Sequence, residues 1–67
     1  MSVKEIIYEK VKKIGQLKDE LAKTDYQAIK YAEGEMTLAE YQPVKDKRKA
    51  YRTEINALQA EIKALRG

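Results

Sequence analysis

Residues 44–65, VKDKRKAYRTEINALQAEIKAL, are the stretch that decides the fold. Apolar side chains recur along it at alternating spacings of four and three residues, which is the heptad pattern of a narrow coiled-coil seam. The seam positions are Val44, Arg48, Tyr51, Ile55, Leu58, Ile62 and Leu65. Arg48 is the only charged residue among them. This pattern predicts a long helix over residues 43–66 that packs one face against another helix.

A second long helix is predicted upstream, over residues 2–23. Ser2 and Glu5 have the spacing of a capping box, in which each side chain accepts a hydrogen bond from the other residue's backbone N–H. The apolar stripe of this helix is roughly 140° wide, wider than a two-stranded seam, so we expect the helix to contact more than one element. Its predicted packing residues are Val3, Ile7, Ile14, Leu17 and Leu21.

A short middle helix is predicted between the two, over residues 25–33. Thr24 and Gln27 have capping-box spacing, Tyr26 and Ile29 would lie on its inner face, and Gly34 is a typical left-handed stop.

Pro43 leaves two interpretations of the segment between Gly34 and the last helix. Thr37 and Glu40 form a further capping box, which predicts a helix start. Either a separate turn over residues 38–41 precedes a helix that begins at Pro43, or one long helix runs through Pro43 with a kink. We favour the first, because a proline disfavours helical backbone at the residue before it.

Together these elements predict a single all-α domain over residues 1–67. It is a helical hairpin of two long antiparallel helices with coiled-coil-like packing and a short middle helix. We predict a register with Leu21 opposite Val44 and Ile14 opposite Tyr51. The opposite charges that this register aligns on one flank are Lys13 with Glu54 and Glu20 with Lys47.

The other flank of the hairpin is apolar and basic, because it places Val11 near Arg52 and Lys18 near Lys45. We expect the middle helix or a second subunit to cover it. Arg48 on the seam has two interpretations. Either the aliphatic part of its side chain lies on apolar surface while the guanidinium reaches water, as we also expect for the ammonium of Lys10, or the guanidinium pairs with a carboxylate such as Glu33 or Glu40.

The composition argues against catalysis and against a bound metal. Among the 67 residues there is no Cys and no His, so there is no disulfide, no thiolate ligand and no imidazole base. We find no triad, glycine-rich phosphate loop or metal-ligand motif. We therefore expect no enzyme activity, no cofactor and no metal.

The charge pattern and the absence of long apolar runs limit the kinds of partner that we expect. Fourteen basic and 11 acidic side chains give a mild charge of +3, and acidic residues are interspersed throughout. That pattern favours solvated faces over nucleic-acid binding. No apolar run approaches a membrane span, and the N-terminus lacks a signal-peptide pattern. We expect no membrane contact and a location in the cytoplasm of a bacterial host or in a virion.

The tyrosines divide into two expected groups. Tyr26 and Tyr41 should pack, whereas Tyr8 and Tyr31 should be exposed. Exposed tyrosines next to cations suit either a protein interface or stacking on a nucleotide, and the interface is the stronger interpretation.

Residues 17–62 carry a distinctive set of motifs. They are Thr24-Asp25-Tyr26, Ile29-Lys30, Glu33-Gly34, Glu40-Tyr41, Pro43, Arg48, Arg52 and Glu54-Ile55-Asn56. This segment resembles one found in phage and prophage proteins, either as a short protein or as the C-terminal piece, TDYxxIKxxEG, of a tail-associated protein. The resemblance implies a phage setting, and it implies no activity and no site residues.

Three functions are hypotheses at this point. The first, which we favour, is a non-enzymatic phage structural or assembly module that acts through helix–helix contacts with a copy of itself or a phage structural protein. The second is an antagonist of host defence that sequesters a nucleotide signal or blocks a host protein. It predicts a pocket that combines Tyr8 or Tyr31 with Lys12 or Lys30. The third is a weak nucleic-acid-binding protein.

Overall fold

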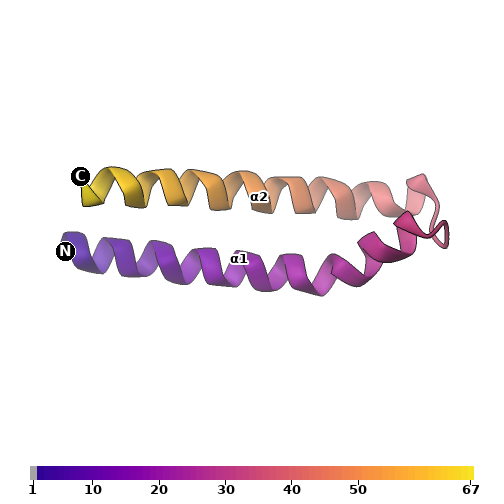
Figure 1. Cartoon of the computed structure of the whole chain (residues 1–67), viewed down its shortest axis with the longest axis horizontal. Coiled ribbons are helices and arrows are strands. Elements are labelled where there is room, and N and C mark those ends of the chain that lie inside the picture. Colours follow the sequence, from indigo (N-terminus) through magenta and orange to yellow (C-terminus); the bar gives the residue numbers. More distant parts are fainter. Residues whose placement is uncertain (1) are drawn as a thin grey trace.

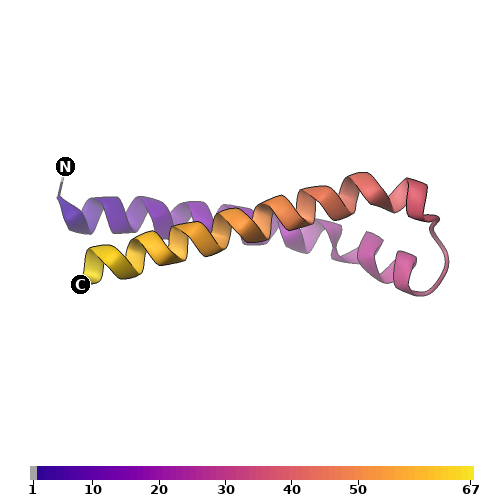
Figure 2. The same cartoon turned by 90° about the horizontal axis from the view of Figure 1, so that it is seen from above.

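The chain folds into a hairpin of two antiparallel helices that lie side by side along most of their length (Figure 1). The computed structural model describes residues 2–67, so Met1 of the predicted domain lies outside the described residues. Helix α1 spans Val3–Ala32, helix α2 spans Leu38–Arg66, and residues 33–37 join them. The two helices cross at a small angle when the hairpin is seen from above (Figure 2). The hairpin measures 48 × 15 × 15 Å, as expected for helices of 30 and 29 residues that rise about 1.5 Å per residue.

Both ends of α1 are set by local sequence signals. At its start the backbone N–H of Glu5 donates to the Ser2 hydroxyl over 3.2 Å, which is one half of the predicted capping box. At its end Gly34 adopts a positive φ of 79°. The N–H of Gly34 then donates to the Tyr31 carbonyl and that of Glu35 to the Lys30 carbonyl, at 3.1 and 2.9 Å. This is a Schellman motif, and the predicted stop at Gly34 is confirmed.

The predicted short middle helix does not exist as a separate element, because residues 25–32 continue α1. Thr24 does not cap a new helix; its hydroxyl donates to the carbonyl of Leu21 over 2.9 Å, inside α1. Threonine can bond either to following N–H groups as a cap or to a preceding carbonyl within a helix, and here the second option prevails. The predicted inner residues Tyr26 and Ile29 are 68% and 56% exposed.

Helix α2 starts at the predicted capping box and runs through Pro43 without interruption. The Thr37 hydroxyl accepts from the N–H of Glu40, and the Glu40 carboxylate accepts from the N–H of Thr37. The favoured interpretation, a separate turn before a helix beginning at Pro43, is therefore wrong, and the single long helix is right. Pro43 lies in the second turn of α2, on an exposed face. Because proline has no backbone N–H, the carbonyl of Ala39 lacks its usual helical hydrogen bond, and water can satisfy it instead.

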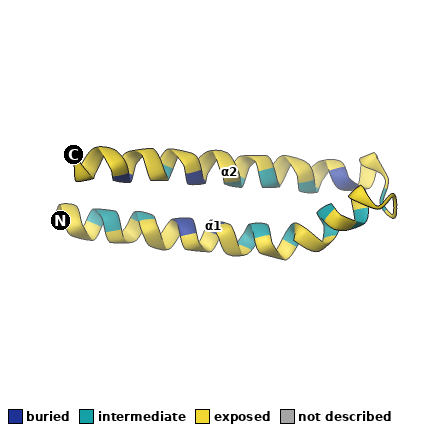
Figure 3. Cartoon of the chain, viewed as in Figure 1, coloured by how far each residue is buried: buried dark blue, intermediate teal, exposed yellow. Residues whose placement is uncertain are grey.

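A narrow core runs between the helices, and most residues outside it are exposed (Figure 3). Its buried members are Ile14, Leu17, Ile55 and Ile62, with Ile7, Leu21, Tyr51 and Leu58 packed against them. At the loop end Tyr41 is also buried, and its ring stacks on that of Tyr31 with centroids 4.5 Å apart. The heptad prediction for α2 therefore matches the buried face of that helix.

The register differs from the predicted one by one heptad. Lys10 pairs with Glu61 at 2.7 Å, and Arg48 donates to the Leu21 carbonyl at 2.9 Å rather than lying opposite Leu17. A slip of seven residues keeps both apolar faces in the seam, so the hydrophobic pattern alone does not distinguish the two registers. The longer α1 places the turn at residues 33–37, which is compatible with the observed register.

The changed register explains which predicted seam and flank contacts are missing. Val3 is 51% exposed because α2 ends before it reaches that level, and Leu65 at the open end is 36% exposed. The predicted partners Lys13 with Glu54 and Glu20 with Lys47 are no longer level with each other. Glu20 instead pairs with Lys23 on its own helix at 3.0 Å.

Candidate interaction surface

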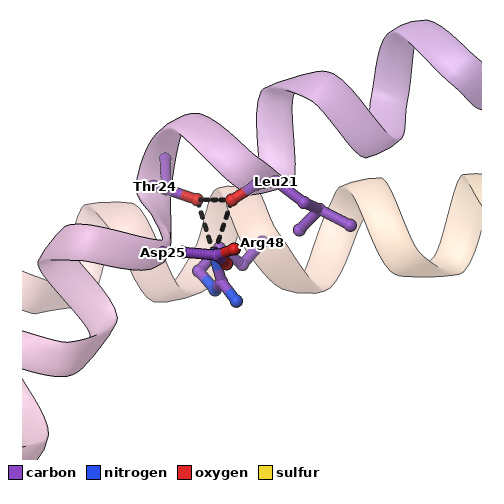
Figure 4. A network of polar contacts seen from close by, with 4 residues as sticks. All are labelled: Leu21, Thr24, Asp25 and Arg48. Atoms are coloured by element: carbon purple, nitrogen blue, oxygen red, sulfur yellow. Dashed lines mark hydrogen bonds and ion pairs between the residues drawn. The ribbon is translucent and has the colours of Figure 1, made fainter.

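Within residues 2–67, the largest set of polar contacts between the two helices is centred on the mostly buried side chain of Arg48. Nη1 of Arg48 donates to the Leu21 carbonyl at 2.9 Å, to the Thr24 hydroxyl at 2.7 Å and to the Asp25 carboxylate at 3.0 Å (Figure 4). The Arg48 side chain is 14% exposed, whereas that of Asp25 is 60% exposed. The charge therefore sits at the edge of the seam, with its counter-ion facing water.

This cluster explains a change of direction in α1. One nitrogen with two hydrogens serves three acceptors, so at least one of its hydrogen bonds is shared. The Leu21 carbonyl accepts from both Arg48 and Thr24. Side chains that bond a helix carbonyl pull it away from the helix axis, and such insertions bend helices. Helix α1 bends in its last third, at the level of this cluster (Figures 1 and 4).

The expectation that Arg48 pairs with a carboxylate is correct in kind, but Asp25 takes the place of Glu33 or Glu40. Those two lie in or beyond the turn region, whereas Asp25 lies within the extended α1. Lys10 has the other predicted role: its side chain is 25% exposed, and its ammonium reaches out to Glu61. The hydrogen bond from Arg48 to the Leu21 carbonyl could not be predicted from the sequence, because every residue has a backbone carbonyl and the residue type does not indicate which one accepts.

Helix α1 carries a second apolar line outside the seam, which we call the outer stripe. It lies about 120° around α1 from the seam at 100° per residue. Its large members are exposed: Tyr8 by 69%, Val11 by 48%, Tyr26 by 68% and Ile29 by 56%. Small residues lie between them. The outer stripe consists of Tyr8, Val11, Gly15, Ala22, Tyr26 and Ile29.

The middle of the outer stripe is open. A Cβ atom built on Gly15 would meet nothing within 4 Å. Next to Val11, a shallow hollow continues onto α2 and is lined there mainly by Gln59, Lys63 and Arg66. The apolar and basic flank that the sequence predicts therefore exists, with Gln59 rather than Arg52 beside Val11, and no middle helix covers it.

The tyrosines are not arranged as one pocket. The Lys30 ammonium lies 5.3 Å from the centroid of the Tyr26 ring, a cation–π contact on the surface. Tyr31 stacks on Tyr41, which is confirmed as a packing residue, whereas Tyr26 is not one. Tyr8 is exposed as predicted.

Tyr8 lies in a surface hollow of α1 together with Lys4 and Lys12. Glu5 and Glu9 line the same hollow, so its cations are offset by carboxylates that repel a phosphate. The hollow is built on one helix face, which leaves the other face of a bound base in water. The predicted combination of Tyr31 with Lys30 is absent, because Lys30 lies over Tyr26.

Two exposed groups have shifted pKa values. Glu40 belongs to the capping box of α2, and Lys23 belongs to an ion pair on the surface of α1. Hydrogen bonds from the backbone N–H and the hydroxyl of Thr37 hold the pKa of Glu40 below its ordinary value of 4.5. The hydrogen bond to Glu20 and its negative charge raise the pKa of Lys23 above 10.5. Neither group lies in a cleft, so neither shift indicates acid–base chemistry.

Known proteins provide no family for this chain: no family model, no curated protein and no solved structure matches it. Within residues 2–67, no three acidic, His or Cys side chains are grouped so that they could hold a metal ion. Neither described helix combines the length and the apolar character that a membrane span requires.

Sequence reasoning missed the outer stripe because it divided α1 into two helices. With the break at Thr24, Tyr26 and Ile29 belong to a separate helix and fall on its inner face. On one continuous helix, Tyr8, Gly15, Ala22 and Ile29 recur every seven residues. That spacing was the available signal, and it becomes visible only when helix α1 is extended through Thr24.

Proposed function

We propose that this protein is a non-enzymatic helix–helix interaction module that serves in the assembly of a phage or prophage particle. The observation that carries the proposal is the exposed outer stripe. Large apolar side chains at 48–69% exposure lie on one line along α1. Aligned apolar residues that remain exposed on a helix mark a surface for another helix.

The weakness of the core supports the same proposal. Only five hydrophobic residues are buried, and no side chain of the described residues is less than 2% exposed. Small domains without a disulfide or a metal usually gain stability from association. Contact along the outer stripe would add apolar burial to a hairpin that has little of its own.

The phage setting rests on the resemblance of residues 17–62 to a segment of tail-associated phage proteins. Helix pairing is preferred over nucleotide binding because the hollow around Tyr8 contains Glu5 and Glu9 as well as its two lysines. A nucleotide phosphate in this hollow would be attracted by the lysines and repelled by the glutamates. An apolar helix face does not depend on either kind of charge.

Site-specific photo-crosslinking in phage-producing bacteria tests the proposal. Benzoylphenylalanine would replace Tyr26 on the outer stripe and, as a control, Gln16, which is exposed on the face away from both the stripe and the seam. We expect Tyr26→benzoylphenylalanine to give a discrete adduct with a second copy or with an identified particle protein, and Gln16→benzoylphenylalanine to give none. Equal or absent adducts at the two positions would contradict the proposal.

A further inference from the structure

We propose that the outer stripe binds a second copy of this chain, so that two α1 helices pair antiparallel about a two-fold axis. This inference rests on the proposed function and deepens it, because it names the partner. A two-fold pair uses the same surface on both copies, which is the commonest arrangement of homodimers. The outer stripe must then be complementary to itself.

The exposed area supports a partner of this size. A compact monomer of 7.7 kDa would expose about 4,300 Å². This hairpin exposes 5149 Å². The excess is close to the area of about 800 Å² that each partner buries in a standard interface. The elongated hairpin therefore leaves open about as much surface as one more copy would cover.

The outer stripe has its small residues, Gly15 and Ala22, in the middle and large residues on both sides of them, so its pattern reads the same in either direction. When Val11 lies opposite Ala22 of the second copy, Ala22 lies opposite Val11 of that copy by symmetry. Gly15 then lies opposite the stem of Lys18, where its missing side chain gives the stem room. Tyr8 and Ile29 fall toward the two ends of the contact. Val11 thus meets a small residue, while Tyr8 of each copy comes level with Tyr26 of the other, where the two aromatic rings can pack against each other.

Charges next to the outer stripe favour the same alignment. Lys12 and Asp19 are exposed on the flank of the stripe that faces away from α2. In the antiparallel pair, Lys12 of each copy approaches Asp19 of the other, which gives two opposite-charge contacts. A shift of the pair by one heptad in one direction would instead bring the two Asp19 carboxylates together. Such flanking charges select orientation and register in helix pairs.

Light scattering after size exclusion of the purified chain tests the inference, with two arginine variants. Gly15→Arg adds a long side chain where the single hairpin has open space, and arginine is a better helix former than glycine. It should therefore leave the hairpin folded and block the pair. Gln16→Arg adds the same charge one residue away, about 100° around the helix from Gly15 and outside the outer stripe. We expect a dimer of twice 7.7 kDa for the unchanged chain and for Gln16→Arg, and a helical monomer for Gly15→Arg.

A charge exchange tests the orientation. Lys12→Asp should weaken dimerisation by placing two carboxylates together, and Lys12→Asp with Asp19→Lys should restore it. A dimer that survives Gly15→Arg would overturn the inference, and so would a chain that stays monomeric at millimolar concentration. If the purified chain is monomeric but Tyr26→benzoylphenylalanine captures a different particle protein, self-pairing fails while the proposed function stands. If neither a dimer nor an adduct forms, both fail.

Discussion

Arg48 donates a hydrogen bond of 2.9 Å to the backbone carbonyl of Leu21, which lies 27 residues earlier in the chain. This contact distinguishes two registers that the apolar seam accepts equally. In the observed register, Arg48 also reaches Thr24 and Asp25. One heptad away it would face Leu17, an apolar residue with no acceptor in its side chain. A buried cation without acceptors is costly, so Arg48 favours one register over the other.

Arg48→Leu should therefore keep the helices and loosen the register. Leucine completes the apolar heptad, so we expect unchanged helicity by circular dichroism and equal or higher thermal stability. The register is measured by the distance between spin labels at Lys4 and Lys45, near the open end of α1 and the start of α2. A one-heptad slip shortens that distance by about 10 Å, since helices rise about 1.5 Å per residue. We expect a second, shorter population in Arg48→Leu.

The matched control is Arg52→Leu, which removes an arginine from an exposed position of the same helix. Its label distance should remain single and equal to that of the unchanged chain. A single long distance in Arg48→Leu as well would show that the length of the loop, rather than Arg48, selects the register.

The sequence predicts the faces of the helices better than their boundaries. The seam positions from Val44 to Ile62 are predictable because a heptad pattern repeats and so averages over local exceptions. The break at Thr24 is a wrong prediction because threonine with glutamine three residues later satisfies the capping rule on its own. Only the contact with Arg48 from the other helix shows that the Thr24 hydroxyl bonds backward. Pro43 misleads in the same way, since a local preference yields to the packing of the whole helix.

Gly34 should resist substitution by residues with a side chain. Its φ of 79° lies in the left-handed region, where a Cβ atom costs about 1–2 kcal/mol, although no neighbour would clash with that atom. We expect Gly34→Ala to lower the free energy of unfolding by about that amount in urea titration, and Gly34→Asn to lower it less. Gly67 has the same φ but follows the last helical residue and leads into no further element, so Gly67→Ala should have a much smaller effect. Equal effects at the two glycines would contradict the role of the Schellman turn.

The capping box at Thr37 should make stability depend on pH. Because hydrogen bonds from Thr37 lower the pKa of Glu40 in the folded chain, Glu40 contributes stability above its ordinary value of 4.5 and loses it as the pH falls through the lowered value. Glutamine can replace glutamate in a capping box but does not titrate. We expect the melting temperature of Glu40→Gln to fall less than that of the unchanged chain between about pH 6 and pH 3.

All other groups are common to the two chains, so the difference between their melting temperatures at each pH reports on Glu40 alone. Parallel melting curves for the chain and for Glu40→Gln would show that the capping hydrogen bonds do not change the pKa of Glu40. Thr37→Ala provides a second comparison, since loss of an N-cap lowers stability by about 1 kcal/mol at neutral pH.

Ile55 should be a sensitive position of the seam. Its side chain is 7% exposed and packs in the core cluster with Leu17 and Ile62. Truncation of a buried isoleucine to alanine costs about 2–5 kcal/mol, which is a large part of the stability of a chain this small. We expect Ile55→Ala to melt at a much lower temperature and Ile55→Asp, which buries an unpaired carboxylate, to be unfolded. Asn56→Asp adds the same charge at the next, exposed position and should melt like the unchanged chain. If Ile55→Asp also melted like the unchanged chain, the contact between α1 and α2 would not be what holds the hairpin together.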